Sequence, residues 1–202
     1  MEEKKKPIIG ITMGDVNGIG PQIILKALAH ERLYKMCQIV VFGSESVVQF
    51  YKKTFPNLKT NFHVIGKSED QKLSTKLPNL IECSDKPVIV NMGISNDFSG
   101  TLSLRFINDA LFHLQNKKID ALVTAPVNKS FIKTNPEFLG HTDYLGSKSN
   151  VSNTLMVMSS ESLKVALVTH HVPLQEVSKK LSIPSILEKI KLFNHSLIHD
   201  IG

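Results

Sequence analysis

The stretch from Pro7 to Pro21 reads Pro-Ile-Ile-Gly-Ile-Thr-Met-Gly-Asp-Val-Asn-Gly-Ile-Gly-Pro, and it decides the fold class. Its first half is a short run rich in β-branched residues, and its second half is a glycine-rich turn. From Pro21 to Met36, apolar residues recur at helical spacing, and Pro21 suits a first helical turn. A strand, a tight turn and a helix in this order are the opening unit of an α/β protein with a parallel sheet.

The glycine-rich turn has two interpretations. Backbone amides at such a turn can approach a phosphate. The specific nucleotide motifs are missing, however, because no Gly-x-x-x-x-Gly-Lys-Ser/Thr is present and the dinucleotide pattern would need glycine at Ile23. Gly18 and Gly20 then only permit a tight turn, with Asp15 as its turn or cap residue. The spacing alone favours this second interpretation.

Strands and helices alternate along the rest of the chain. Strands are predicted over Gln38–Phe42, His63–Gly66, Val88–Asn91 and Ala121–Ala125, the last of them buried. Helices are predicted over Ser46–Lys53 and Thr101–Gln115, and Lys67–Lys86 is predicted to be mostly loop. A hairpin of Thr154–Met158 and Leu163–Thr169 precedes helices over Leu174–Leu181 and Ile186–His199. This order predicts a mostly parallel, doubly wound sheet in a first α/β domain (1–124), followed by the start of a second (125–202).

Composition and charge exclude several classes of protein. Cys37 and Cys83 lie far apart without metal-motif spacing, and we interpret them as reduced packing residues of a cytoplasmic protein. No apolar run reaches the roughly 18 residues of a membrane span. The net charge of +6 is spread along the chain. This pattern predicts scattered surface lysines and no binding to nucleic acid or membrane.

The stretch Gly140-His141-Thr142-Asp143 is the first candidate for chemistry. Histidine titrates near neutral pH, and a threonine hydroxyl can hydrogen-bond a phosphate or carboxylate oxygen. The alternative is that Thr142 or Asp143 only caps the helix that follows. The sequence leaves both interpretations open.

A second candidate follows the strand predicted over Ala121–Ala125. In open α/β sheets, ligands bind outside the carboxyl ends of the strands. Lys129 comes shortly after this strand end, where it could contact an anion. An ordinary exposed loop lysine is at least as good an interpretation.

Two pairs of histidines complete the candidates. His170 and His171 follow a predicted strand, and a strand end is a suitable position for a metal ligand. Because neighbouring side chains of an extended chain point in opposite directions, at most one of the two should face a cleft. His195 and His199 have the spacing of two ligands on one helix face. Without the glutamate of the His-Glu-x-x-His motif, we interpret them as part of a solvated face.

Taken together, these segments resemble the 4-hydroxythreonine-4-phosphate dehydrogenase family of vitamin B6 biosynthesis. The family's Gly-Asp-Pro-x-Gly-Ile-Gly-Pro-Glu, Val-Thr-x-Pro-x-x-Lys, Gly-His-Thr-Glu-x-Leu and Thr-His-x-Pro-Leu segments correspond, in this order, to Gly14–Gln22, Val123–Lys129, Gly140–Leu145 and His170–Leu174. His171 occupies the position of the last motif's histidine. Val16, Gln22 and Asp143 replace the family's usual proline and two glutamates.

The resemblance implies a fold similar to isocitrate and isopropylmalate dehydrogenases, with two α/β domains and a cleft completed across a homodimer. It implies NAD-dependent oxidation of 4-phosphooxy-L-threonine and decarboxylation to 3-amino-2-oxopropyl phosphate. A divalent zinc, magnesium or cobalt ion would serve as Lewis acid. By the match, His171 is one metal ligand, while His141 and Thr142 contact the small phosphorylated substrate.

The family's chain is much longer than this one. The resemblance implies two further metal-binding histidines and most of the NAD-binding loops beyond residue 202, so the second domain should be incomplete. We therefore expect the chain alone to be inactive, with an unpaired sheet edge that favours aggregation or a partner. One alternative is a paralogous dehydrogenase of phosphoerythronate or phosphothreonate. Another is a non-catalytic fragment that only binds a ligand or dimerises.

Overall fold

The computed structural model describes residues 6–66, 72–133, 138, 140–149, 151 and 153–201. The chain forms two compact units, Met1–Ser149 and Asn150–Gly202. This division falls later in the chain than the domain boundary predicted after residue 124. That boundary concerns the domains of the complete family fold, and it stays a prediction.

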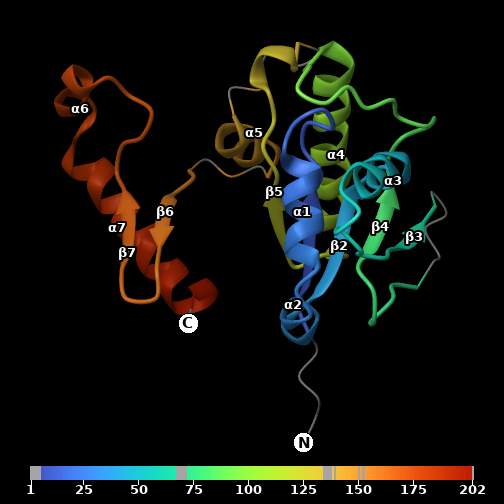
Figure 1. Ribbon diagram of the computed structural model, residues 1–202. Helices are drawn as coiled ribbons and strands as arrows, with labels where there is room; N and C mark the ends of the chain where they lie inside the picture. Colours follow the sequence, from blue (N-terminus) through green and yellow to red (C-terminus); the bar gives the residue numbers. More distant parts are fainter. Residues whose placement is uncertain are drawn as a thin grey trace, which may run out of the picture. The chain divides into compact units, whose positions relative to one another are not determined.

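A five-stranded sheet in the order β3-β4-β2-β1-β5 organises the first unit (Figure 1). All four neighbouring pairs are parallel, and Ile11 of β1 lies between Val41 and Val123 in the register. The parallel α/β architecture predicted from the sequence is thus confirmed. The strands are β1 (Ile8–Thr12), β2 (Gln38–Gly43), β3 (His63–Ile65), β4 (Asn79–Glu82) and β5 (Ala121–Thr124).

Helices connect these strands as the apolar spacing predicts. The helical pattern predicted through Met36 is interrupted after Leu28, so that it forms two helices instead of one. The helices of the first unit are α1 (Gly20–Leu28), α2 (Arg32–Met36), α3 (Glu45–Thr54), α4 (Asp97–Gln115) and α5 (His141–Lys148), with a short 3-10 helix η1 (Lys129–Phe131).

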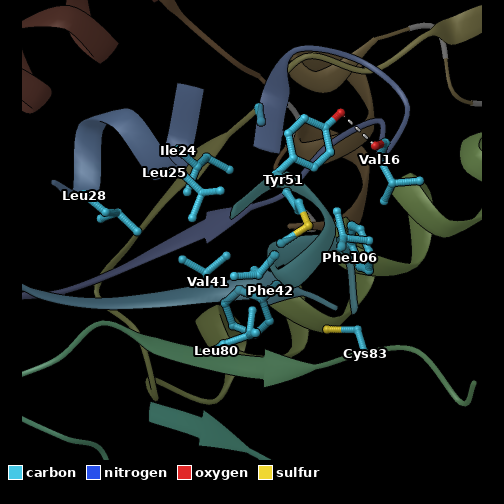
Figure 2. Packing of buried hydrophobic residues seen from close by; sticks show 14 of the residues in the cluster. Val16, Ile24, Leu25, Leu28, Val41, Phe42, Tyr51, Leu80, Cys83 and Phe106 are labelled. Carbon is cyan, nitrogen blue, oxygen red and sulfur yellow. Dashed lines mark hydrogen bonds between the residues drawn. The ribbon is translucent and has the colours of Figure 1, made fainter. Parts of the chain in front are cut away.

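The sheet carries helices on both faces. The Phe42 ring of β2 contacts the ring of His113 on α4, with 5.0 Å between the centroids. Because side chains alternate along a strand, Val41 points to the opposite face. On that face, Leu25 and Leu28 of α1 belong to the same buried apolar cluster (Figure 2). Burial of these side chains is the main force that holds the layers together.

The prediction of a strand over Val88–Asn91 is wrong, although buried and exposed side chains do alternate along this segment. Val88 and Val90 are buried, whereas Ile89 is 79% exposed. The backbone N–H of Val88 donates to the Ser46 hydroxyl rather than to a neighbouring strand. The segment is therefore extended but held by side chains, outside the sheet.

The missing strand is β4, which lies inside the stretch predicted to be mostly loop. Asn79 begins it and is fully buried. Its side-chain amide donates to the carbonyl oxygens of Ile39 and Ser74, both at 3.1 Å. A polar residue at this position hides the strand from a hydrophobicity pattern, while its hydrogen bonds make its burial possible.

The sequence predicts β5 to be a buried strand, but the structure shows it to be partly exposed. In the described part of the chain it forms one edge of the sheet, since it pairs only with β1. Val123 is accordingly 51% exposed. An edge strand of this kind presents unpaired backbone groups to a further strand or to another chain.

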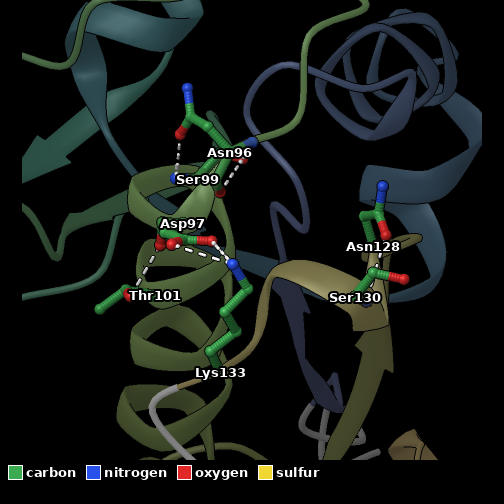
Figure 3. Close-up of polar contacts among 7 residues, drawn as sticks. All are labelled: Asn96, Asp97, Ser99, Thr101, Asn128, Ser130 and Lys133. Carbon is green, nitrogen blue, oxygen red and sulfur yellow. Dashed lines mark hydrogen bonds and ion pairs between the residues drawn. The ribbon is translucent and has the colours of Figure 1, made fainter.

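α4 begins earlier than predicted because Asn96 caps it. The Asn96 side chain accepts a hydrogen bond from the Ser99 backbone N–H at 2.9 Å, and the Ser99 hydroxyl accepts one from the Asn96 N–H at 3.1 Å (Figure 3). This reciprocal arrangement is a capping box. Lys133 forms an ion pair with Asp97 in the first turn, at 3.0 Å.

The second unit pairs β6 (Met156–Ser159) and β7 (Lys164–Leu167) in an antiparallel hairpin, as predicted. α6 (Leu174–Lys180), α7 (Ile183–Ser196) and a π-helix η2 (Leu197–Ile201) follow. None of its described residues is buried, and large apolar side chains such as Leu174 (88%) and Ile183 (83%) are exposed. Across the described chain, no helix combines the length and apolar character that crossing a membrane requires.

Candidate functional site

The turn after β1 and the loop after β5 lie side by side at the carboxyl ends of these strands. The Asp15 N–H donates to the Pro126 carbonyl oxygen at 3.0 Å. Gly14 has a φ of +71°, and a Cβ added there would lie 2.4 Å from the same oxygen. Only glycine tolerates both conditions. The strand order reverses at β1, and such a reversal is the usual ligand position in an open α/β sheet.

The glycine-rich turn itself is a packing element. Asp15 accepts hydrogen bonds from the Asn17 N–H at 3.0 Å and from the Ser95 hydroxyl at 2.5 Å. The Tyr51 hydroxyl donates to the Gly18 carbonyl oxygen at 2.7 Å. Burial, and then the charge of Asp15, raise the pKa of Tyr51 to about 12, so this donor keeps its proton. Asp15 is thus a turn residue, which agrees with the second interpretation of the sequence.

A second apolar cluster fixes the position of α5. Phe138 is buried, and its ring lies 5.8 Å from that of His141 and 5.1 Å from that of Tyr144. The Tyr144 hydroxyl donates to the side-chain oxygen of Asn108 on α4 at 2.6 Å. This hydrogen bond joins α5 to α4, and the Phe138 ring packs against α5 as well. Nothing in the sequence pattern identifies Asn108 as the partner.

The N-terminus of α5 is open to an anion. Gly140 is its N-cap residue, and no side chain among the described residues caps the helix. The interpretation of Thr142 or Asp143 as a cap is therefore wrong. Free backbone N–H groups and the helix dipole at such a terminus favour a bound anion. Thr142 is exposed in this first turn, so its hydroxyl is accessible to a ligand.

His141 is the first residue of α5, and the Lys129 ammonium group lies near it. Its Nε2 atom is buried and has no hydrogen-bond partner among the described residues. Burial, and then the positive charge of Lys129, lower the pKa of His141. A Cβ added at Gly140 would lie 3.1 Å from the Lys129 ammonium nitrogen, so glycine leaves room for that group. The result is a neutral imidazole with one unused nitrogen beside a cation.

We expect Lys129→Met to raise the pKa of His141, but not to its ordinary value, because burial is the larger cause of the shift. The lowered pKa of His141 also makes the stability of the folded protein depend on pH. A lowered folded pKa contributes stability above the unfolded value of about 6.5, and that stability is lost as pH falls through the folded pKa. His141→Gln should remove this loss.

An NMR titration of the imidazole measures this pKa. Lys133→Met is the matched control, because this lysine forms its ion pair with Asp97 instead. A pKa of His141 that stays unchanged, or falls, in Lys129→Met would contradict the assigned contact.

His170 and His171 lie beyond the end of β7, outside the extended strand that the sequence suggested, and His171 is in a bend. The argument from alternating side chains therefore does not apply to them. His171 is exposed and has a φ of +55°, which is uncommon for a residue other than glycine. The two rings are 5.4 Å apart and nearly perpendicular, at 85°. His170 is half-buried, and its Nδ1 has no hydrogen-bond partner in the described part of the chain.

The first unit thus brings together Lys129, Gly140, His141 and Thr142, and His171 belongs to the second unit. Among residues whose placement is described, no three His, Cys, Asp or Glu side chains gather as a metal site. A cavity of about 520 Å³ lies elsewhere, and none of these residues lines it. Its lining includes Val40, Ile81, Cys83, Arg105 and Phe112.

Comparison with known sequences gives consistent matches. The family model described as pyridoxal phosphate biosynthetic protein PdxA matches residues 35–202. A 4-hydroxythreonine-4-phosphate dehydrogenase of Bacteroides thetaiotaomicron is 30% identical over 202 residues, which are 99% of this chain and 55% of the relative. A relative from Oceanobacillus iheyensis, named "putative D-threonate 4-phosphate dehydrogenase", is 32% identical over 197 residues, which are 96% of this chain and 58% of that one.

The same relationship is found among solved structures. The 4-hydroxythreonine-4-phosphate dehydrogenase of Burkholderia phymatum superposes with a TM-score of 0.85 at 26% identity, over 96% of this chain and 59% of that one. Such dehydrogenases have the isocitrate/isopropylmalate dehydrogenase-like fold, so the predicted fold class is confirmed. The chain spans little more than half the length of the relatives that it matches.

Proposed function

Because this chain belongs to the pyridoxal phosphate biosynthetic protein PdxA family, we propose that it forms part of an NAD-dependent dehydrogenase of 4-phosphooxy-L-threonine. One observation of the structure supports a phosphate ester as the class of substrate. The uncapped N-terminus of α5 lies beside the Lys129 ammonium group and the unused Nε2 of His141. Helix amides, a cation and an imidazole together suit an anionic phosphate ester.

The proposed reaction oxidises the secondary alcohol of the substrate. Its C–H hydrogen leaves as a hydride to NAD, and its hydroxyl proton is released. The resulting β-keto acid loses carbon dioxide and gives 3-amino-2-oxopropyl phosphate. In this scheme His141 and Thr142 hold the substrate. Because its lowered pKa keeps His141 neutral, it can donate or accept one hydrogen bond without placing a second cation beside Lys129.

The metal in this proposal is a divalent zinc, magnesium or cobalt ion, which supplies Lewis-acid polarisation of the alcohol oxygen when bound. His171 fits one ligand position, because its ring is exposed and makes no hydrogen bond in the described part of the chain. A catalytic zinc site needs about three protein ligands. We therefore propose that the other ligands come from outside the described residues.

A second substrate is favoured by one specific observation. The Oceanobacillus iheyensis relative is as similar to this chain as the relative named for 4-hydroxythreonine 4-phosphate, and its printed name refers to D-threonate 4-phosphate. The two substrates share a phosphate ester, which the site at α5 would bind equally. Initial rates with each substrate, in an enzyme that contains the remaining part of the family's chain, would separate the two functions.

We propose that this enzyme forms a homodimer and that it is located in the cytoplasm. Large apolar side chains of the second unit, such as Leu174 and Ile183, are exposed, and contact with further polypeptide would bury them. Cys37 and Cys83 are both free, which agrees with a reducing compartment.

Thr142→Val should weaken substrate binding in the completed enzyme. A lost hydrogen bond to a charged group costs roughly 1.5–3 kcal/mol, which corresponds to about a tenfold or larger rise in KM. Thermal stability should stay unchanged, because Thr142 is exposed and does not cap α5. Ser147→Ala, elsewhere on α5, is the control for general damage to the helix. Unchanged saturation in Thr142→Val would remove this residue from the site.

A further inference from the structure

His195 and His199 form a close pair in the second unit. Their ring centroids are 4.4 Å apart, and the rings are tilted by 44°. Both residues are exposed. The spacing of four residues therefore does place both imidazoles on one side of the helix, and both are accessible to solvent.

The pair spans a change of helix type. His195 is in the last turn of α7, and His199 lies in the π-helix η2. α7 is anchored at its start by a capping box of Ser182 and Ser185, and the Lys189 ammonium group donates to the Thr154 carbonyl oxygen at 2.6 Å. The two histidines are thus carried by an anchored helix.

We propose that His195 and His199 together bind a late first-row divalent cation, namely Cu²⁺, Ni²⁺ or Zn²⁺. Imidazole nitrogen is a preferred ligand of these ions, and affinity should be highest for Cu²⁺. Two histidines one helical turn apart can share one ion, as in helical zinc motifs. Mg²⁺ should not bind, because it prefers oxygen ligands. No third His, Cys, Asp or Glu joins the pair among the described residues, so water completes the coordination.

This site differs from the ligand position proposed for His171, and the two can be tested separately. Calorimetric titration of the purified chain with NiCl₂ or CuCl₂ should detect one site that depends on the pair. His195→Ala and His199→Ala should each weaken it by at least about tenfold, because each variant removes one of the two imidazole ligands. His171→Ala should leave it in place, and His30→Ala, which removes another exposed histidine, serves as the control.

A second measurement needs no substitution. In the unmodified chain, substoichiometric Cu²⁺ should broaden the imidazole NMR signals of His195 and His199 before those of His30. Weakened binding in both pair variants, together with this selective broadening, supports the site. Binding that keeps its full affinity in either pair variant, or broadening that affects all histidines equally, overturns it. Either result leaves the proposed dehydrogenase function untouched, because that function rests on α5 and His171.

Discussion

We expect His171→Ala to abolish metal-dependent turnover in a completed enzyme, whereas His170→Ala keeps most of it. The completed enzyme joins this chain to the part of its relatives' length that it does not span. His171 matches the family's motif histidine, and it is exposed with a left-handed φ of +55°. A residue other than glycine costs about 1–3 kcal/mol in such a conformation, and these conformations concentrate at active sites.

The structure gives His170 a different role. It is half-buried, so His170→Ala should lower thermal stability more than it lowers turnover. Its buried Nδ1, which has no partner among the described residues, is the strongest argument for the opposite assignment. Metal titrations of the initial rate in both variants decide between the two. Equal losses, or a larger loss in His170→Ala, would contradict the role of His171.

The regular elements could be predicted where the apolar spacing is strong. α4 is the clearest example, because Leu102, Phe106 and Ala110 recur at helical spacing and are all buried. Its start could not be placed, because Asn96 caps the helix through a reciprocal pair with Ser99. Both residues are polar and lie in a polar stretch, so the spacing that identifies the helix does not reach them.

β4 shows why the rest could not be predicted. The strand has four residues, Asn79–Glu82, and its first residue is a buried amide. It forms because β2 and β3 lie on either side of it, and these neighbours are remote in the sequence. Val88 and Val90 show the reverse case, where alternating burial arises without strand pairing. A pattern of residues does not contain the tertiary contacts that separate the two.

The candidate site was predictable in its residues but not in its geometry. The Gly-His-Thr-Asp stretch identified His141 and Thr142, yet only the structure shows that Gly140 is the cap residue and that the helix terminus is open. The contact of Lys129 with this position likewise depends on folding, since sequence spacing does not separate a site lysine from an exposed loop lysine. Asn108 and Phe138, which hold α5 in place, gave no signal at all.

A second prediction with a large expected effect concerns the purified 202-residue chain, which we expect not to reduce NAD. Hydride transfer requires cofactor, substrate and metal in near-attack geometry, and misplacement of one of them is heavily penalised. In the glycine-rich turn of the first unit, Asp15 and Asn17 are buried, and Asp15 already accepts hydrogen bonds from Asn17 and Ser95. None of the described residues of the second unit is buried. Among the described residues, no two further His, Cys, Asp or Glu side chains join His171 to form a metal site.

The direct measurement is NADH formation by the purified 202-residue chain, supplied with 4-phosphooxy-L-threonine, NAD and a divalent metal. The same chain, joined to the part of a relative that it does not span, serves as the positive control. We predict no NADH from the chain alone and metal-dependent NADH from the joined protein. NADH formation by the chain alone would contradict the proposal that it forms one part of the dehydrogenase.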